Sequence, residues 1–573
     1  MKKKFFGKLF GLTLLMFTLL FTGASAEVYE GTGLGYDKNG IILDVEITNN
    51  KIVDVKVKRA KESDFATPAI QEIAKKVIAT QSLDVDGVSG ASLTSEGTKE
   101  AIEEAVKKSG ITLTTVTVQN VRTVEFPKET DVVVIGAGGA GLTSAIAAHE
   151  KGAKVILIEK TELLGGNTNY ATAGLNAAGT KIQEKLGIKD SPELFYEDTM
   201  KGGKNKNNKE LVRVLVNNSS AIVDWLIERG ADLSEITSTG GQSVKRTHRP
   251  TGGSAVGPNI VAALSKTAEN EKIDIRKGTK AIALVKTKNR IVGVKVREID
   301  GKEYTIKAKA VIVATGGFGA NAKMVEKYNP KLKGFGSTNN PAIVGDGIIM
   351  VEKVGGALVD MNEIQTHPTV VHNKTNMITE AVRGEGAILV NKDGKRFIDE
   401  LETRDVVSKA ILSQKGKSAF LIFDEDIRTK LKAADGYVKK GFAVEGTLEE
   451  IAAKIGTDAK TLEATLNKYN EAVRDKVDSE FNKKTLPKEL TGTKYYAIEV
   501  SPAVHHTMGG VRINTNAEVL GKNGRPIKGL YAAGEVTGGI HGANRIGGNA
   551  VADITIFGKI AGENAAIYSK SVK

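Results

Sequence analysis

The sequence predicts an α/β protein in which a dinucleotide-binding domain of the Rossmann type follows a small α+β unit. Three observations support this fold class. Apolar and polar residues alternate between 41 and 57, a strand, a glycine-rich turn and a helix follow one another at 132–151, and the chain has 573 residues. That length gives room for three or four domains, each with its own core. Apolar residues form 40% of the chain and charged residues 26%, proportions typical of a folded protein.

The sequence contains no cysteine. This excludes disulfides, thiolate-bound iron–sulfur clusters, cysteine-bound zinc, a catalytic thiol and a CxxCH haem site, so any redox chemistry must use another cofactor. The formal net charge is +13, which favours small anions as ligands; a lysine-rich solvated surface is the alternative interpretation. Nucleic acid is a poor candidate partner, because the basic residues are dispersed and aromatic residues form only 5% of the chain.

Residues 1–26 have the pattern of a signal peptide. Lysines at positions 2, 3, 4 and 8 precede the apolar run Leu9–Phe21, and Ala24-Ser25-Ala26 has the small-x-small pattern of a cleavage site. The run of 13 residues is too short to span a bilayer, and a retained interfacial anchor is the alternative. We therefore expect an exported protein that works in the periplasm, outside the cell or at its surface.

Residues 27–115 are expected to form the small α+β unit. The segments Ile41–Ile47 and Ile52–Val57 alternate apolar and polar residues on either side of Asn49-Asn50, which is a hairpin pattern. A linker at 116–130 is expected to join this unit to the rest of the chain.

The pattern then changes to that of a dinucleotide-binding fingerprint. The strand Val132–Ile135 is followed by the turn Gly136–Gly141, a helix to Lys151, and a second strand, Val155–Ile158, that ends at Glu159. Gly136 permits the tight turn, Gly138 lets the backbone approach a pyrophosphate, and Gly141 allows close packing of helix on strand. Glu159 can hold the ribose hydroxyls. The fingerprint alone leaves FAD and NAD undecided.

Three later segments resemble those that wrap an extended FAD in flavoproteins of the two-dinucleotide-binding class: Gly165-Gly166-Asn167-Thr168, Ala314-Thr315-Gly316-Gly317 and Leu530–Glu535. This resemblance implies non-covalent FAD and a chain that returns late to its FAD domain. The expected domains are therefore a first part of the FAD-binding domain at 131–250, an inserted α+β capping domain at 251–360, and a second part with the substrate site at 361–573.

A second resemblance concerns the turn between two expected helices, at 68–80 and 95–108. This turn reads Asp86-Gly87-Val88-Ser89-Gly90-Ala91-Ser92, and on spacing alone it is only a loop. It resembles the signature of FMN-binding domains in which a flavin transferase attaches FMN, through a phosphoester, to the last hydroxyl residue. The resemblance implies covalent FMN on Ser92, with Thr94 as the alternative acceptor.

Five further motifs resemble the soluble flavoprotein fumarate reductases of the flavocytochrome c type, from about residue 128 to 570: Gln365–Thr369, Thr379–Gly384, Glu402–Asp405, His505–Gly510 and His541–Asn549. The resemblance implies hydride transfer from N5 of reduced FAD to the C=C bond of fumarate, giving succinate in anaerobic respiration. It also implies a set of cofactor-binding residues: Gly136, Gly138, Gly141, Glu159, Gly166, Asn167, Thr168, Asp346, Glu535 and Ala550.

The same resemblance assigns roles around the substrate. Arg545 and His505 would bind one carboxylate of the dicarboxylate, and His367, Thr379 and Glu380 would surround the other, because a guanidinium matches a carboxylate with two parallel hydrogen bonds. Arg404 would donate the proton, resupplied through Arg383 and Glu380. If 379–383 is helical, Thr379 and Arg383 share a face; a structural ion pair on a surface helix is the alternative.

The remaining histidines, His506, His372, His248 and His149, are expected to be packing or surface residues, and no metal site is expected. Without CxxCH motifs, FMN is expected to replace the haems of the family, taking electrons from a membrane or extracellular donor. Three alternatives stay open: a reductase of urocanate or another 2-enoate, a non-catalytic two-flavin electron carrier, and an oxidase working in the reverse direction.

Overall fold

The computed structural model describes residues 26–35, 40–60, 62, 66–88, 91–116, 128–288, 290–374 and 376–572. The predicted signal peptide, most of the predicted linker, and Ser89-Gly90 of the FMN motif lie outside the described residues. Within these ranges, no helix combines the length and the hydrophobicity that crossing a membrane requires.

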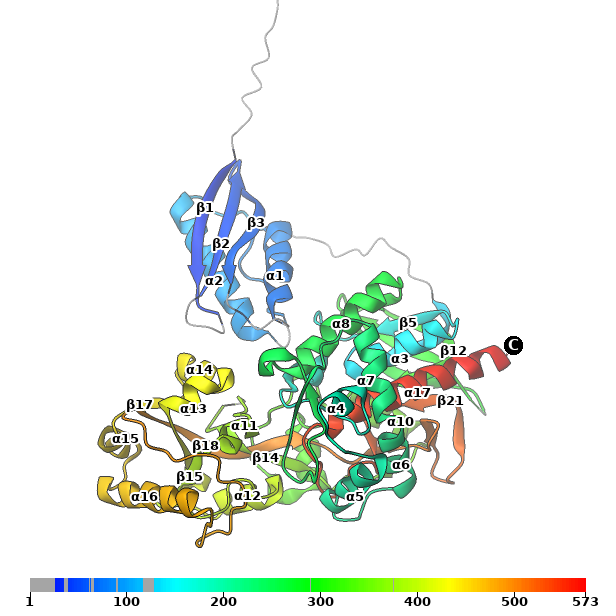
Figure 1. The fold of residues 1–573 in the computed structure, drawn as a ribbon. Helices are drawn as coiled ribbons and strands as arrows, with labels where there is room; N and C mark the ends of the chain where they lie inside the picture. Colours follow the sequence, from blue (N-terminus) through cyan, green and yellow to red (C-terminus); the bar gives the residue numbers. More distant parts are fainter. Residues whose placement is uncertain are drawn as a thin grey trace, which may run out of the picture.

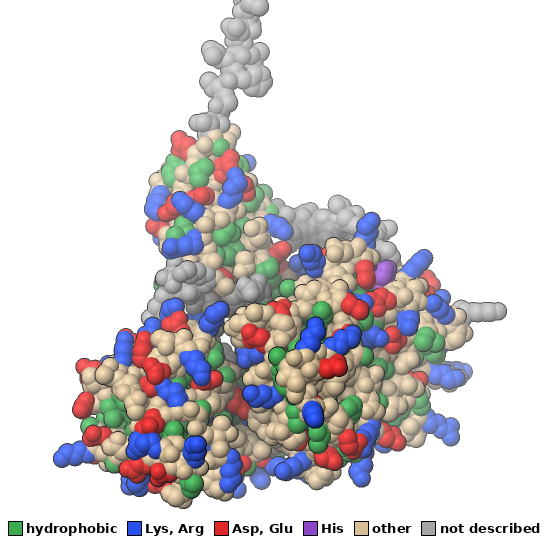
Figure 2. All heavy atoms as spheres, in the orientation of Figure 1, with side chains coloured by type: hydrophobic (Ala, Val, Ile, Leu, Met, Phe, Trp, Pro, Cys, Tyr) green, Lys and Arg blue, Asp and Glu red, His purple; other side chains and the backbone are tan. Residues whose placement is uncertain are grey.

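The described chain has three hydrophobic cores, which correspond to the three parts of the ribbon in Figure 1. The face drawn in Figure 2 carries lysines and arginines interspersed with acidic residues. The basic side chains are dispersed, as expected from the sequence, and they form no continuous basic surface on that face.

The amino-terminal domain is an antiparallel three-stranded sheet, β1 (Glu27–Gly33), β2 (Ile41–Thr48) and β3 (Lys51–Ala60), with helices α1 (Thr67–Thr80) and α2 (Ser92–Ser109). The predicted hairpin is confirmed. Asn49 and Asn50 have φ values of 52° and 59°, the left-handed conformation that a type I′ turn requires and that asparagine tolerates. Residues Ile41, Leu43, Val45 and Ile47 are buried, because alternate positions of a strand face the same side.

Helix α2 begins at Ser92, three residues before the expected start. Its first turn is tied to the glycine-rich turn by Ser95, whose hydroxyl accepts from the Val88 amide and donates to the Ala91 carbonyl, both at 2.9 Å. The expected helix at 68–80 is present as α1.

The FAD-binding domain is built on an eight-stranded sheet. Its central strands, β12 (Glu303–Val313), β4 (Glu129–Ile135), β5 (Val155–Ile158) and β9 (Asp274–Arg276), are parallel. Strand β21 (Pro526–Ala532) pairs in parallel with β12 and in antiparallel with β20 (Glu518–Leu520), and β11 (Ile291–Glu298) and β10 (Thr279–Lys286) extend the sheet in antiparallel.

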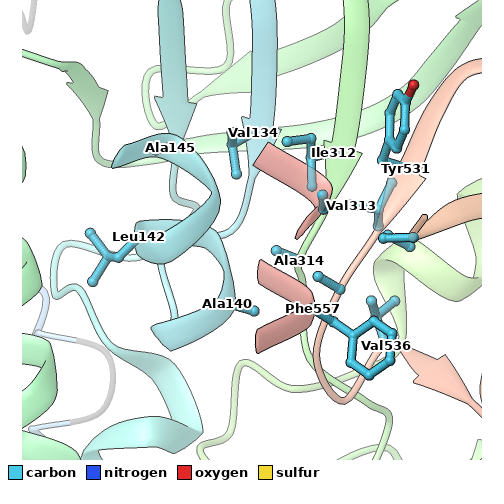
Figure 3. Packing of buried hydrophobic residues seen from close by; sticks show 14 of the residues in the cluster. Val134, Ala140, Leu142, Ala145, Ile312, Val313, Ala314, Tyr531, Val536 and Phe557 are labelled. Carbon is cyan, nitrogen blue, oxygen red and sulfur yellow. The ribbon is translucent and has the colours of Figure 1, made fainter. Parts of the chain in front are cut away.

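Two helices cover the centre of this sheet, α3 (Gly139–Glu150) and α17 (Asn549–Ser571). Figure 3 shows Ala140 of α3 and Phe557 of α17 in one apolar cluster with Val134 and Val313 of the strands. The strands are continuous apolar runs because both of their faces are buried, as expected for a parallel sheet.

The remaining elements of this domain surround the sheet. The helices are α4 (Lys181–Lys185), α5 (Pro192–Gly202), α6 (Lys209–Asn217), α7 (Ser219–Glu228), α8 (Val256–Asn270), α9 (Ala322–Tyr328) and α10 (Asp346–Lys353). Two small sheets are formed by β6 (Leu175–Asn176), β8 (Thr247–Arg249) and β7 (Glu235–Thr237), and by β13 (Leu358–Val359), β19 (Gly510–Arg512) and β22 (Thr537–Gly538).

The capping domain lies elsewhere in the chain than predicted, and the expected range of 251–360 is wrong. Strands β9 to β12 fall in that range but belong to the FAD-binding sheet, where Val311 pairs with Val133 of β4 and with Leu530 of β21. The separate core instead extends from Val371 to Val500, inside the segment that was expected to complete the FAD-binding domain. Apolar strands of an inserted domain and of the main sheet look alike in sequence, and only their partners differ.

The capping domain contains a five-stranded antiparallel sheet: β14 (Gln365–Val371), β18 (Tyr495–His506), β16 (Ala419–Asp424), β15 (Ile388–Val390) and β17 (Val444–Gly446). Its helices are α11 (Glu380–Gly384), α12 (Arg404–Leu412), α13 (Glu425–Lys430), α14 (Lys432–Lys439), α15 (Leu448–Ile455) and α16 (Ala459–Asp475). Strand β18 contributes to two cores: Tyr495–Val500 pack in the capping domain, and Val504 packs in the FAD-binding domain.

Candidate active site

The fingerprint forms the cradle that the sequence predicts. Gly136 follows β4 with a φ of 98°, a conformation that favours glycine. A Cβ atom on Gly141 would lie 1.7 Å from the Gly136 carbonyl oxygen, so this position packs helix α3 directly on the turn. Gly138 precedes α3, and the helix amides that follow it carry the partial positive charge that attracts a pyrophosphate.

Glu159, at the end of β5, is held beside this turn. Its Oε2 accepts from the Ala137 amide and its Oε1 from the Thr161 amide, both at 2.9 Å. The loop after Glu159 closes onto the fingerprint, because the Gly165 amide donates to the Ala137 carbonyl at 2.8 Å.

A long cavity, with about 1500 Å³ of unfilled space partly open to solvent, runs from this cradle to a cluster of arginines. Apart from Gly141, the predicted cofactor-binding residues line it: Gly136, Gly138, Glu159, Gly166, Asn167, Thr168, Asp346, Glu535 and Ala550. The glycine cradle, the amides of α3 and the ribose-binding carboxylate occur at one end of the cavity. These features fit FAD, whose adenosine and pyrophosphate need such partners.

Two of the lining carboxylates are held by protein groups. Glu535 accepts from the Thr507 amide at 3.0 Å and from Asn167 at 3.3 Å, and burial raises its pKa. Asp346 pairs with Lys160 at 2.5 Å.

The far end of the cavity is lined by Arg404, His505 and Arg545. His505 and His367 lie on the paired strands β18 and β14, with ring centroids 5.2 Å apart. Arg404 is the first residue of α12, and Arg545 belongs to the loop before α17. Side chains from both domains therefore meet at this point.

Glu380 lies behind Arg404 and connects it with Arg383. The Oε2 atom of Glu380 is 3.3 Å from Arg404 Nε and 3.9 Å from Arg383 Nη2, and its Oε1 accepts from the Gly240 amide at 3.1 Å. The expected pairing of Glu380 with Arg383 on one helix is present in α11. Arg383 is 1% exposed, so the alternative of an ion pair on a surface helix is wrong.

Thr379 is the N-cap of α11 rather than part of it, so the expected shared helical face with Arg383 is not formed. Its amide donates to the hydroxyl of Tyr437 at 3.0 Å.

Burial and positive charge set the ionisation of this cluster. Burial and the nearby Arg404 hold the pKa values of His367 and His505 well below the ordinary value. Burial lowers the pKa of Arg545 to about 9 and also lowers that of Arg383. For Glu380, burial alone would raise the pKa, but Arg404 and Arg383 outweigh it and lower the pKa.

Several buried nitrogen atoms in this cluster have no hydrogen-bond partner among the described residues. They are Nε of Arg545, Nε and Nη2 of Arg383, and both ring nitrogens of His367. Within the same described ranges, no carboxylate forms an ion pair with Arg545. Buried donors without partners are costly, so the cluster is suited to a ligand that brings negatively charged oxygens.

Sequence reasoning assigned no role to two residues that position the cluster. Gln365 accepts from Arg404 at 3.5 Å and donates to the Arg545 carbonyl at 2.8 Å. It stands two residues before His367 on a strand, and this spacing could have identified it. Thr338 lies 2.7 Å from His505 Nδ1, but it belongs to a loop without a recognisable motif.

Of the histidines expected to be packing or surface residues, His506 does more than pack. It is buried, lines the cavity, and places its ring 5.3 Å from that of His541. His248 is buried with its Nε2 atom 2.8 Å from the hydroxyl of Thr180.

Comparisons with known proteins agree with this geometry. The FAD binding domain family matches residues 131–551, and the FMN-binding domain family matches residues 35–107. The chain is 52% identical to the fumarate reductase (cytochrome) of Shewanella frigidimarina, over 77% of each chain. It is 45% identical to the NADH:fumarate oxidoreductase of Klebsiella pneumoniae (strain 342), over 92% of this chain but 57% of that protein's length.

A urocanate reductase of Eggerthella lenta is more distant, at 35% identity over 95% of this chain and 93% of that protein. The solved open conformation of a flavocytochrome c3 fumarate reductase matches with a TM-score of 0.69 and 44% identity, over 77% of this chain and 78% of that one. The predicted fold class and the predicted family are thereby confirmed. The chain belongs to the flavoprotein fumarate reductase family, with an FAD-binding domain interrupted by a capping domain and preceded by an FMN-binding domain.

Proposed function

We propose that this protein reduces fumarate to succinate. The observation that carries the proposal is the convergence of Arg404, Arg545 and His505 at one end of the cavity, with the buried side chains of Arg383 and His367 next to them. A small dianion supplies the negative charge that this cluster lacks. The comparisons support the same substrate, because the relatives at 45% and 52% identity are named NADH:fumarate oxidoreductase and fumarate reductase (cytochrome).

FAD, when bound, supplies the hydride for the C=C bond. The residues that would hold it are those of the cradle and the cavity walls: the fingerprint glycines, Glu159, Gly166, Asn167, Thr168, Asp346, Glu535 and Ala550.

One pole of the cluster would bind a substrate carboxylate through Arg545 and His505. Because its pKa is lowered, His505 is neutral at pH 7 and has one ring proton. Its Nδ1 is engaged with Thr338 at 2.7 Å, which fixes the ring and leaves Nε2 for the ligand. Arg545 adds a guanidinium that can take a carboxylate with two parallel hydrogen bonds.

The second pole would hold the other carboxylate near His367, Thr379 and Glu380. His367 is also neutral and has unpartnered ring nitrogens. The cation beside this pole is Arg404, whose Nε lies 3.3 Å from Glu380 Oε2. A fixed cation at this place stabilises the negative charge that develops on the neighbouring carbon during reduction.

Proton delivery is assigned to Arg404. Arg404 and Arg383 both pair with Glu380, but only Arg404 lines the cavity, and Arg383 lies behind Glu380. An arginine is a weak acid, but the carbon it would protonate is a far stronger base than a carboxylate, and burial of Arg383 eases proton exchange along the chain of groups.

The FMN-binding domain would carry FMN on Ser92 through a phosphoester. Ser92 begins α2, and its side chain lies outside the described residues. Thr94, the alternative acceptor, is 2% exposed and its hydroxyl donates to Glu62 at 2.5 Å, which favours Ser92. A flavin transferase would make this bond. The leader sequence supports export and an electron donor at the membrane or outside the cell.

The substrate is tested with the purified holoenzyme and a chemically reduced viologen as donor. Fumarate, urocanate, acrylate and cinnamate are compared, and we expect the highest kcat/KM with fumarate. A higher kcat/KM with urocanate would identify urocanate, rather than fumarate, as the substrate. Absence of turnover with all four compounds would favour a non-catalytic electron carrier.

The FMN site is tested by mass spectrometry. A Ser92→Ala protein should lose the mass of covalent FMN and keep FAD, while Thr94→Ala, as the matched control, should retain both flavins. FMN still attached to Ser92→Ala and missing from Thr94→Ala would move the acceptor to Thr94.

A further inference from the structure

The FMN-binding domain contacts the FAD-binding domain at the loop 160–165, which follows Glu159. Lys76 Nζ of α1 lies 2.9 Å from Glu162 Oε2, and the two side chains are 25% and 21% exposed. The next residue, Leu163, packs against the apolar core of the FMN-binding domain. One helical turn before Lys76, Glu72 pairs with Lys277 at 3.9 Å. An apolar contact flanked by charge pairs is typical of a specific interface between domains.

The opposite side of the same loop forms part of the flavin cavity. Lys160, Thr161 and Gly165 line that cavity together with Glu159. The Thr161 hydroxyl lies 2.9 Å from Glu159 Oε1 and 2.8 Å from the Leu163 carbonyl. Thr161 thus connects Glu159, the carboxylate expected to bind the FAD ribose, with Leu163, which packs on the FMN-binding domain.

The turn after β9 gives this loop a second connection. The Gly278 amide donates to the Thr161 carbonyl at 3.2 Å, and the Thr279 amide donates to the Glu159 carbonyl at 2.8 Å. Lys277, which pairs with Glu72, lies directly before them. Both charge pairs of the interface therefore join segments that hold Glu159 in place.

Lys76 also orients the FMN motif. Besides Glu162, its ammonium group donates to the carbonyl of Asp86 at 3.1 Å, and Asp86 is the first residue of the turn that leads to Ser92. A single lysine thus connects the turn expected to carry FMN with the loop that borders FAD.

We propose that the loop 160–165 is a shared element, which docks the FMN-binding domain on one side and helps to bind FAD on the other. The inference rests on the proposed function for the identity of the two flavins. Because coupling between two binding events is reciprocal, docking strengthens FAD binding and FAD binding strengthens docking by the same factor.

Docking is tested by cross-linking, which is clean here because the chain contains no cysteine. In Glu72→Cys with Lys277→Cys, which keeps the Lys76–Glu162 pair, a short bis-maleimide should join the two residues in most molecules, and the yield should fall when FAD is removed. The control pair is Lys107→Cys with Lys277→Cys, since Lys107 is an exposed residue of α2 that pairs with Glu103 of the same helix. Equal yields for the two pairs would overturn the proposed docking, and equal yields with and without FAD would overturn the coupling.

The coupling is tested separately by titrating FAD into the stripped protein. Lys76→Glu should weaken FAD binding about two- to fivefold, the range for one partly exposed ion pair. Lys107→Glu, with the same charge change, should leave it unaltered, and Lys76→Glu with Glu162→Lys should restore it. Unchanged affinity in Lys76→Glu, or no recovery in the double variant, would overturn the proposal.

The outcome is independent of the substrate. Viologen-driven reduction of fumarate by the unchanged chain, at saturating FAD, is measured as a separate experiment. Failure of the unchanged chain to reduce fumarate would refute the proposed function and leave the FAD titration and the cross-linking as valid tests of the shared loop.

Discussion

Two clusters of charged side chains lie next to each other and differ in their balance of charge. One lies inside the capping domain, and the other lies where that domain meets the FAD-binding domain. In the first, Arg396 and Lys483 face Glu400 and Asp478 at 2.8–3.1 Å, and all four side chains are 0–1% exposed. In the second, Arg404, Arg383 and Arg545 gather with His367 and His505 around Glu380. The first cluster neutralises itself, and the second leaves positive charge for a ligand.

The two clusters are joined by one contact, in which Arg383 donates to the backbone carbonyl of Glu400. The two clusters contain similar residue types but serve different purposes. Burial does not distinguish the two clusters, whereas the number of hydrogen-bond and ion-pair partners of their charged groups does. A balanced cluster fixes the fold, whereas a cluster with unpartnered donors marks a binding site.

The largest expected effect concerns the unbalanced cluster. Arg404→Ala should lower kcat for fumarate reduction about 10³- to 10⁴-fold, because it removes the proton donor and a fixed charge. Flavin absorbance and thermal stability should be close to those of the unchanged protein. Lys409→Ala, at an exposed position on the same helix, is the matched control. Retained activity in Arg404→Ala would mean that another group donates the proton.

The second effect concerns the balanced cluster. Arg396→Met should lower the free energy of unfolding by about 3–5 kcal/mol, because it leaves buried carboxylates without their main partner. Lys395→Met, at the exposed neighbouring position, should change it little. Urea denaturation followed by circular dichroism measures both. If Arg396→Met were as stable as the control, the four charges would not form a stabilising unit.

A ligand should complete the unbalanced cluster and not the balanced one. Succinate at about 100 times its Kd should stabilise the protein by about 2.7 kcal/mol, measured as an increase in Tm. The increase should vanish in Arg545→Met, and propionate, with one carboxylate, should give less. Equal stabilisation by propionate and succinate would contradict a site with two carboxylate-binding poles.

The smallest effect is the pH dependence of the two active-site histidines. Their pKa values are lowered in the folded protein, so the unfolded chain binds more protons below its ordinary value near 6.5. Stability is therefore fully present above that pH and decreases as the pH falls, by at most about 1.4 kcal/mol per pH unit for each histidine. His367→Gln should reduce this slope between pH 6.5 and 5.5. His149→Gln, at a partly exposed position of α3, is the matched control. An unchanged slope in His367→Gln would show that this ring is not buried in its neutral form.

Much of the site could be predicted because its residues are grouped in short motifs. The fingerprint is local, since strand, turn and helix follow one another within about twenty residues, and Glu380 pairs with Arg383 on the same helical turn. The hairpin could be predicted for the same reason. These contacts depend on neighbours in sequence, which a pattern can describe.

The rest depends on partners far apart in the chain. The capping domain was placed at 251–360 because strand β12 gives no sign in its own sequence that it pairs with β4 and β21, each more than 150 residues away. In the same way, nothing local indicates that the carbonyl of Glu400 would receive Arg383, or that Thr338 would orient His505. Such contacts are determined by packing rather than by periodicity.

The paired strands β14 and β18 have a consequence for engineering. Val371 and Val500 are register partners, so the chain leaves the FAD-binding domain and re-enters it at adjacent positions. A transplant of residues 372–499 from a homologue would need two splices, a few ångströms apart. The recipient would keep His367, His505 and Arg545, while the donor would supply Glu380, Arg383 and Arg404. Thr379, Glu380, Arg383 and Arg404 would then be exchanged as a single module, while Arg545, His505 and the FAD cradle stay unchanged.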